Sequence, residues 1–146
     1  MKYLVLIGFC LVLVLGCRQE EETLKTTQKK EIVYDMYEPS EMANLMNQMY
    51  AHNLKVKNDI LSGTIPSEFP LDFLKIHSAE MSEFKERNEI FKSFSKLFIE
   101  AEKEIYNTES PVPLEDRFNR TVNLCISCHQ TECTGPIPRI KKLLIQ

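Results

Sequence analysis

The sequence has little of what several common protein classes require. It contains only 4 glycines in 146 residues, too few for the many tight turns of a β-sandwich. Its net charge of −3 provides no basic excess, which argues against a protein that binds nucleic acid through its phosphates. Its 5 cysteines are an odd number, so they cannot all pair with one another in disulfides. The length favours one domain of ordinary size over two.

Long hydrophobic runs are also absent. The apolar run Leu4–Leu15 follows Met1-Lys2-Tyr3 and is too short to span a bilayer, but it is typical of a secretory signal. The residues Val14-Leu15-Gly16-Cys17 resemble the bacterial lipobox, whose cysteine is lipidated before the signal is cleaved. This resemblance predicts a lipoprotein signal peptide over residues 1–16 and a lipid anchor on Cys17. An unlipidated signal cut nearby, or an uncleaved short anchor, is the alternative.

The segment after Cys17 is too polar to fold by itself. Residues 18–31 carry 8 charges in 14 positions, and Leu24 is their only large apolar residue. We therefore expect a lipidated cysteine and flexible linker over residues 17–38 and one folded domain over residues 39–146. Such a protein would lie on the periplasmic side or the outer surface of a bacterial membrane, tethered to that membrane by acyl chains.

The spacing of apolar residues in the folded domain is typical of helices. Apolar side chains recur there every three or four positions, and no strand-like alternation or internal repeat competes with that pattern. The pattern predicts four helices, which run from the N-cap Ser40 to Gly63, from Pro70 through Leu71, Leu74, Met81 and Phe84, from Ile90 to Ile105, and from Leu114 to just before Gly135. The clearest apolar stripe, on the third helix, consists of Ile90, Phe91, Phe94, Leu97, Phe98, Ala101 and Ile105. Short connections between them predict an all-α fold, an antiparallel four-helix bundle.

The last predicted helix carries the residues Cys125-Ile126-Ser127-Cys128-His129, which match the attachment sequence for c-type haem. Spacings of three and four residues place the two thiols and the imidazole on one helix face. The thiols of Cys125 and Cys128 can then form thioethers with the haem vinyl groups while His129 binds the iron. The motif therefore predicts one covalent haem c. The alternatives are a bare redox dithiol or a zinc site that adds Cys133, although zinc prefers ligand pairs from separate loops.

The position of this motif resembles that of class II cytochromes c, the family of cytochrome c′ and cytochrome c556. Only 17 residues follow His129 and none is methionine, which excludes the class I arrangement with its downstream methionine ligand. The resemblance covers roughly residues 39–133 and implies that residues 39–146 bind haem on the last helix of the bundle. The chain departs from the family at Glu132 and Cys133, where an aromatic and a basic residue are usual.

The sequence does not decide which residue, if any, is the sixth ligand of the iron. The first helix of that family presents a residue to the far face of the haem. A methionine there gives electron transfer, whereas an apolar residue leaves iron free to bind small gases. An ungapped count from the turn at Gly63 places Asn47 at this position, which is not a usual iron ligand. Its neighbours Met46 and Met49 are therefore the candidate ligands, against an open site or a histidine, His52 before His77.

The sequence offers few further candidates near the haem. Arg139, in the tail after Pro136, is a candidate partner for a haem propionate, and Arg117 and Arg120 are alternative partners. The other interpretation of the tail is a frayed basic end without such a role. Cys133 follows His129 by one helical turn, so we expect a buried thiol beside the haem. Otherwise it is a free thiol able to pair with another chain.

These features together predict an exported, lipid-anchored monohaem cytochrome c that passes single electrons between redox partner proteins. No nucleophile and base pair is apparent, so we do not expect an enzyme. A cytochrome c′-like binder of nitric oxide or carbon monoxide, or a haem subunit of a larger respiratory complex, is the alternative function. The resemblance to class II cytochromes also implies a tendency to form homodimers.

Overall fold

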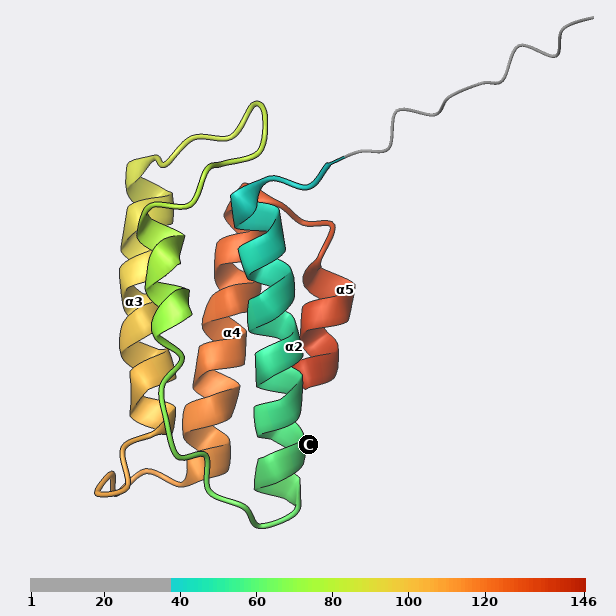
Figure 1. Ribbon diagram of the computed structural model, residues 1–146. Coiled ribbons are helices and arrows are strands. Elements are labelled where there is room, and N and C mark those ends of the chain that lie inside the picture. The colour runs from blue at the N-terminus through green and yellow to red at the C-terminus, as the bar shows by residue number, and fades with distance from the viewer. Residues whose placement is uncertain (1–37) are drawn as a thin grey trace, which may run out of the picture. The chain divides into compact units, whose positions relative to one another are not determined.

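The computed structural model describes residues 38–146, and the regular structure in this range is entirely helical. Three predictions fall outside the described residues: the signal peptide with Cys10, the lipidation of Cys17, and the linker before residue 38. The elements are α2 (Glu41–Leu61), the 3₁₀ helix η1 (Leu71–His77), α3 (Glu89–Ile105), α4 (Leu114–Glu132), α5 (Ile137–Ile140) and the 3₁₀ helix η2 (Lys141–Leu143) (Figure 1). The all-α prediction is confirmed for this range. No helix within it is long and apolar enough to cross a membrane.

The helix ends follow from local capping residues. The Ser40 side chain accepts a hydrogen bond of 3.1 Å from the backbone N–H of Ala43 and so begins α2 as predicted. Gly63 follows the end of α2 with a φ of 77°, a left-handed conformation that favours glycine. The Asn88 side chain caps α3 by accepting a hydrogen bond of 2.7 Å from the N–H of Phe91.

The predicted second helix is much shorter than expected. The seven-residue η1 replaces it, and residues 78–88 form an irregular connection to α3. The buried side chains Phe73, Ile76 and Ala79 recur at intervals of three, which fits the three residues per turn of a 3₁₀ helix. The predicted apolar stripe is wrong for Leu71, Leu74 and Phe84, which are exposed. A bundle of four long helices is therefore not what this range contains.

The three long helices lie alongside one another, with η1 packed against α2 and α3 (Figure 1). At one end of the α3–α4 pair, the Asn88 amide donates a hydrogen bond of 3.3 Å to the Glu132 carboxylate. At the other end, the Arg117 guanidinium donates a hydrogen bond of 3.3 Å to the carbonyl of Ile105. The first residues of α3 therefore lie beside the last residues of α4, and these two helices run in opposite directions.

Two apolar clusters fill the interior. The upper cluster joins the first half of α2 to η1 and α3, and its buried members are Met42, Leu45, Met49, Phe73, Ile76, Ala79, Phe91, Phe98 and Ile99. The lower cluster joins the second half of α2 to α4 and the tail, and its buried members are Val56, Ile60, Ile105, Phe118, Val122, Ile126, Ile140, Leu143 and Ile145. Cys125 is packed against both clusters, so it lies where they meet.

The tail after α4 is folded back onto the helices, so of the two alternatives for it, the frayed basic end is wrong. Its apolar side chains enter the lower cluster. The Lys57 ammonium on α2 donates hydrogen bonds of 2.9 Å to the carbonyl of Lys142 and 2.7 Å to that of Leu144. These bonds satisfy carbonyls at the tail's last turn and hold the tail against α2.

Arg117, which the sequence offered as an alternative partner for a haem propionate, instead holds α4 against the end of α3. Its side chain is buried, and Nη1 donates hydrogen bonds to the carbonyls of Glu104 (2.6 Å), Ile105 (3.3 Å) and Asn107 (2.6 Å). A cation at this position also interacts favourably with the C-terminal end of the α3 dipole. Arg117 lies twelve residues before His129, about 18 Å along the helix, and it is already bound to α3.

We expect Arg117→Met to lower the free energy of unfolding by about 2–3 kcal/mol, because three carbonyls lose a charged donor while the side-chain volume is nearly kept. Urea denaturation followed by circular dichroism measures the change. The control is Arg120→Met, an exposed arginine on the same helix, for which we expect a change within about 0.5 kcal/mol. Equal urea midpoints for the two variants would show that the three hydrogen bonds contribute nothing to stability.

Candidate functional site

The last two turns of α4 carry the Cys125, Cys128 and His129 side chains. Both thiols are free and partly exposed. Burial, with a smaller contribution from the charge of Glu102, raises the pKa of the Cys125 thiol to about 12, and burial raises that of Cys128 to about 11. Both cysteines are therefore protonated at neutral pH in this fold.

The His129 ring is oriented by a hydrogen bond to the chain that follows it. Its Nδ1 lies 2.9 Å from the carbonyl oxygen of Cys133. A carbonyl can only accept, so Nδ1 carries the proton and the lone pair remains on Nε2. In metal-binding histidines, a hydrogen bond from the other ring nitrogen commonly sets the tautomer and the orientation of the imidazole. His129 is therefore prepared to bind a metal through Nε2.

Cys133 is exposed, so the prediction of a buried thiol beside the haem is wrong. That prediction assumed that the helix continues for one turn beyond His129. In fact α4 ends at Glu132, and Cys133 has an extended backbone with φ −162° and ψ 95°. With this backbone conformation the Cys133 thiol is exposed, and the Cys133 carbonyl accepts the hydrogen bond from His129.

The candidate methionine ligands border the same apolar cluster as Cys125. Met49 is buried in the upper cluster, and Met46 packs against it from one turn earlier on α2. Met42 is buried in the same cluster one turn before Met46, and sequence reasoning did not count it among the candidate ligands. The signal for it was the spacing of four residues from Met46, which places both on one helix face. The fold thus places three α2 methionines and Cys125 in or against one apolar cluster.

The other two histidines have protein partners of their own. The Nε2 atom of His52 lies 2.7 Å from the hydroxyl of Tyr106, and its ring meets the Phe73 ring edge-on with a centroid distance of 5.2 Å. Burial lowers the pKa of His52, with the nearby Lys55 adding to the effect. His77 is exposed, with Nδ1 3.4 Å from the hydroxyl of Ser95. A histidine ligand would first have to leave these contacts.

Arg139 holds α5 against α2. Its guanidinium donates a hydrogen bond of 2.9 Å to the Asn47 side chain and lies 3.8 Å from the centre of the Tyr50 ring. Asn47, the residue from the ungapped count, is exposed and points toward the tail. The role of Arg139 as a propionate partner stays a prediction, and Arg120 is exposed on α4.

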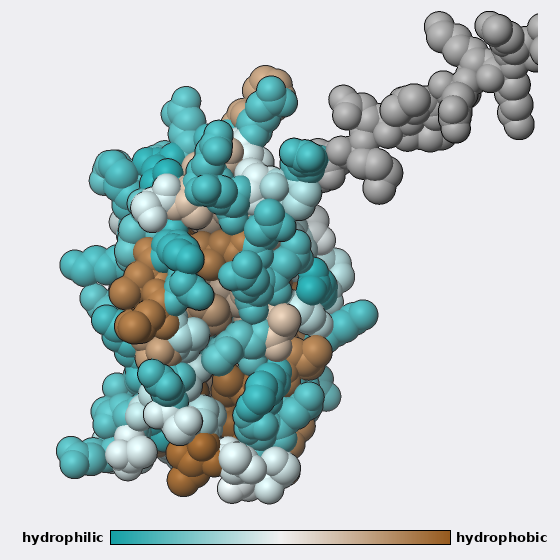
Figure 2. Space-filling view, in the orientation of Figure 1, coloured by the Kyte–Doolittle hydropathy of each residue, from teal (hydrophilic) through white to brown (hydrophobic). Residues whose placement is uncertain are grey.

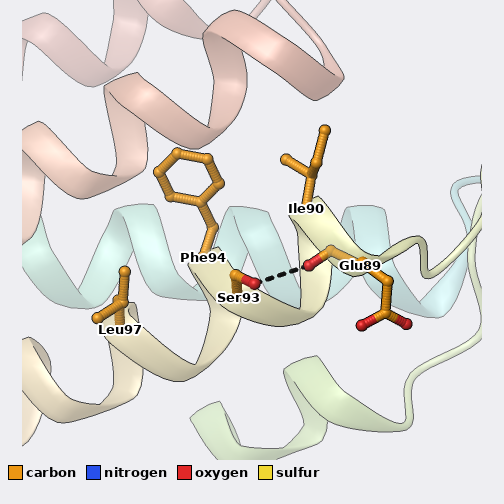
Figure 3. Close-up of a pocket in the computed structure, with 5 residues that line it drawn as sticks. All are labelled: Glu89, Ile90, Ser93, Phe94 and Leu97. Carbon is orange, nitrogen blue, oxygen red and sulfur yellow. Dashed lines mark hydrogen bonds between the residues drawn. The ribbon is translucent and has the colours of Figure 1, made fainter.

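An open, mainly apolar hollow of about 360 Å³ lies on the first half of α3, lined by Glu89, Ile90, Ser93, Phe94 and Leu97 (Figure 3). The Ile90 and Phe94 side chains point toward the ribbon of α4 in that view. Since Asn88 meets Glu132 and the two helices run in opposite directions, this stretch of α3 lies level with the haem motif.

Sequence reasoning placed Ile90 and Leu97 on the core stripe of α3, and this was wrong. Their side chains are 51% and 49% exposed, whereas Phe91, Phe98 and Ile105 are buried. Figure 2 shows apolar surface, in brown, on the side of the molecule where α3 and η1 lie. The apolar part of α3 is thus wider than the stripe that its protein neighbours cover.

One buried charged residue was missed. Glu102 on α3 is 0% exposed, and neither of its carboxylate oxygens has a hydrogen-bond partner. Burial raises the pKa of Glu102 to about 8. The signal in the sequence was its position on the buried stripe, four residues after Phe98 and three before Ile105, where a carboxylate is unusual.

No known protein family, curated protein or solved structure matches this chain. Within residues 38–146, no three side chains of the types histidine, cysteine, aspartate and glutamate gather closely enough to hold a bare metal ion. The zinc alternative therefore has no ready ligand set in this part of the chain. The chemistry of the site depends on its own residues, chiefly Cys125, Cys128 and His129.

Proposed function

We propose that this protein is a monohaem cytochrome c of class II type that transfers single electrons between redox partner proteins. The observation that carries the proposal is the Cys125-x-x-Cys128-His129 motif on one helix, with His129 oriented so that Nε2 is free. In this proposal the helical core is an antiparallel four-helix bundle in which η1 takes the place of the second helix, and haem c is attached to α4.

The residues around the motif fit such a group. The free thiols of Cys125 and Cys128 would hold the haem through two thioether bonds, and His129 would bind the iron through Nε2. Haem c, when bound, supplies an iron that alternates between the ferric and ferrous states. The upper cluster, against which Cys125 packs, and the hollow at Ile90 and Phe94 would offer that group apolar surface.

The neighbourhood of Cys125 favours methionine as the sixth ligand and therefore electron transfer over gas binding. Met49 belongs to the upper cluster, and Met46 and Cys125 both pack against it, whereas His52 already bonds Tyr106. A thioether ligand favours a low-spin iron with both axial positions filled, which changes little in structure between oxidation states. No acid–base step by a protein side chain is required, so the protein is not an enzyme in this proposal.

Anchoring belongs to the same proposal. Acyl chains on Cys17 hold the protein at the periplasmic side or the outer surface of a bacterial membrane. The partners are redox proteins that dock briefly beside the exposed haem edge. The exposed Ile90 and Leu97 lie level with the haem motif and provide apolar surface for such contacts.

The absorption spectrum of the dithionite-reduced full chain, with and without carbon monoxide, tests this function. We expect a low-spin spectrum that carbon monoxide leaves unchanged. Of the variants Met46→Ala and Met49→Ala, we expect one to become high-spin and to bind carbon monoxide. The control is Met81→Ala, since Met81 also packs against the upper cluster but lies outside the α2 stripe.

Two results would contradict parts of this proposal. A wild-type spectrum that shifts with carbon monoxide would mean an open iron site and would favour the gas-binding alternative. A low-spin spectrum that survives in both methionine variants would exclude Met46 and Met49 as ligands. Absence of haem from the purified, exported protein would contradict the cytochrome itself.

A further inference from the structure

The interior holds a carboxyl group and an amide that do not satisfy each other in their present states. Both oxygens of Glu102 on α3 are buried without a hydrogen-bond partner, and so is Oδ1 of Asn53 on α2. The Nδ2 atom of Asn53 donates a hydrogen bond of 3.1 Å to the carbonyl of Met49. Unpaired buried acceptors of this kind are costly, so native proteins rarely keep them.

A proton on Glu102 resolves this conflict. A neutral carboxylic acid has an O–H group, which can donate to Oδ1 of Asn53, whereas two acceptors cannot bond each other. The Asn53 side chain lies close enough to oppose the rise in the Glu102 pKa caused by burial. If Glu102 ionises, Asn53 can turn its amide and present Nδ2, at the expense of the bond to Met49. The pair can therefore accommodate both protonation states of the carboxyl group.

The charge of Glu102 acts on the haem-binding end of α4. It contributes to the raised pKa of the Cys125 thiol, so the two side chains are electrostatically coupled across the interior. In the proposed holoprotein Cys125 forms the first thioether bond to the haem. A ferric haem has one more positive charge than a ferrous haem. A carboxylate on Glu102 therefore stabilises the ferric state, and the protonated acid accompanies the ferrous state.

A partly exposed pair of polar side chains begins one helical turn after Glu102. Tyr106 lies one turn later on α3, where the Glu102 charge contributes to its raised pKa, and its hydroxyl bonds Nε2 of His52 on α2 at 2.7 Å. Both Tyr106 and His52 are partly exposed. Cys125 on α4 is a further ionisable group on which the Glu102 charge acts.

We propose that Glu102 takes up one proton from solvent when the haem iron accepts one electron, and releases it when the iron is oxidised. This inference depends on the proposed haem function. The electron comes from a reduced redox partner protein, and Fe(III) becomes Fe(II). The proton forms an O–H bond on the Glu102 carboxylate, so the buried region gains no net charge. The Tyr106–His52 pair is the route by which the proton enters.

Potentiometric titration of the full-length holoprotein between about pH 6 and 9 tests this inference. For the wild type we expect the midpoint potential to fall with rising pH by up to about 59 mV per unit, the value for one proton per electron. For Glu102→Gln we expect a nearly flat profile over the same range. Glu102→Asp retains a carboxyl group and should restore a pH-dependent potential. Redox-difference infrared spectra should show a carboxylic-acid carbonyl band in the ferrous wild type that Glu102→Gln lacks.

The outcomes separate this inference from the proposed function. If no covalent haem is present, there is no couple to measure and the cytochrome proposal fails. If haem is present and Glu102→Gln has the same slope as the wild type, the cytochrome proposal stands and the role of Glu102 is refuted. An infrared difference spectrum without the carboxylic-acid band would refute it too. The control is Glu100→Gln, an exposed glutamate on α3 that should leave slope and band unchanged.

Discussion

We expect the double variant Cys125→Ala/Cys128→Ala to carry no haem on a denaturing gel, and the wild type to keep the proposed haem through denaturation. Only a thioether bond survives unfolding, and these two cysteines are the ones that the helix places on one face with His129. Haem-dependent peroxidase staining of the gel, together with the mass of the intact protein, measures the loss. We also expect each single variant to stain more weakly than the wild type, since at most one thioether bond can form.

Cys133→Ala is the matched control, because Cys133 is also a free thiol close to His129 but lies beyond the end of α4. We expect this variant to stain like the wild type. Haem staining that persists in the double variant would refute attachment at Cys125 and Cys128. Loss of staining in the Cys133 variant alone would move one attachment point to Cys133.

The second large effect is the pH dependence of stability caused by Glu102. Its pKa is about 8 in the folded protein, against a usual value of 4.5. Below pH 4.5 both the folded and unfolded states hold the proton, so Glu102 costs no stability there. As the pH rises from 4.5 to 8, unfolding releases a proton and the free energy of unfolding falls. Above pH 8 the loss is complete.

The total loss is on the order of 4–5 kcal/mol at 1.36 kcal/mol per pKa unit, and Glu102→Gln removes it. We therefore expect the stability difference between Glu102→Gln and the wild type to grow by about 4 kcal/mol between about pH 5 and pH 8. Urea denaturation at several pH values measures that difference, with exposed Glu100→Gln as the control that should track the wild type. A difference that stays constant with pH would mean that Glu102 is not buried as a neutral acid.

Features governed by neighbours in the sequence were predictable. Ser40 and Gly63 mark the ends of α2 because a side-chain cap and a left-handed residue act within a few positions. The spacing of Cys125, Cys128 and His129 sets their common face in the same way. The orientation of His129 was not predictable, because it depends on the carbonyl of a residue beyond the helix end.

Features that depend on contacts between distant segments could not be predicted. The second helix was overestimated because Leu71, Leu74 and Phe84 resemble a helical stripe, although their side chains are exposed. Which residues of α3 are covered depends on where α4 lies, so Ile90 and Leu97 were wrongly placed in the core. Which α2 methionine is the best candidate ligand could not be predicted for the same reason. Periodicity shows which residues share a helix face, but not how far α2 is shifted along α4.

The place of Cys125 between the two apolar clusters constrains the order of events when the protein matures. A thiol reacts well only as an accessible thiolate, and in the folded chain this one is packed on both sides with a pKa of about 12. In the proposed cytochrome, the thioether bond to Cys125 therefore has to form before the two apolar clusters close around this thiol. Packing of the two halves of the core would then follow haem attachment.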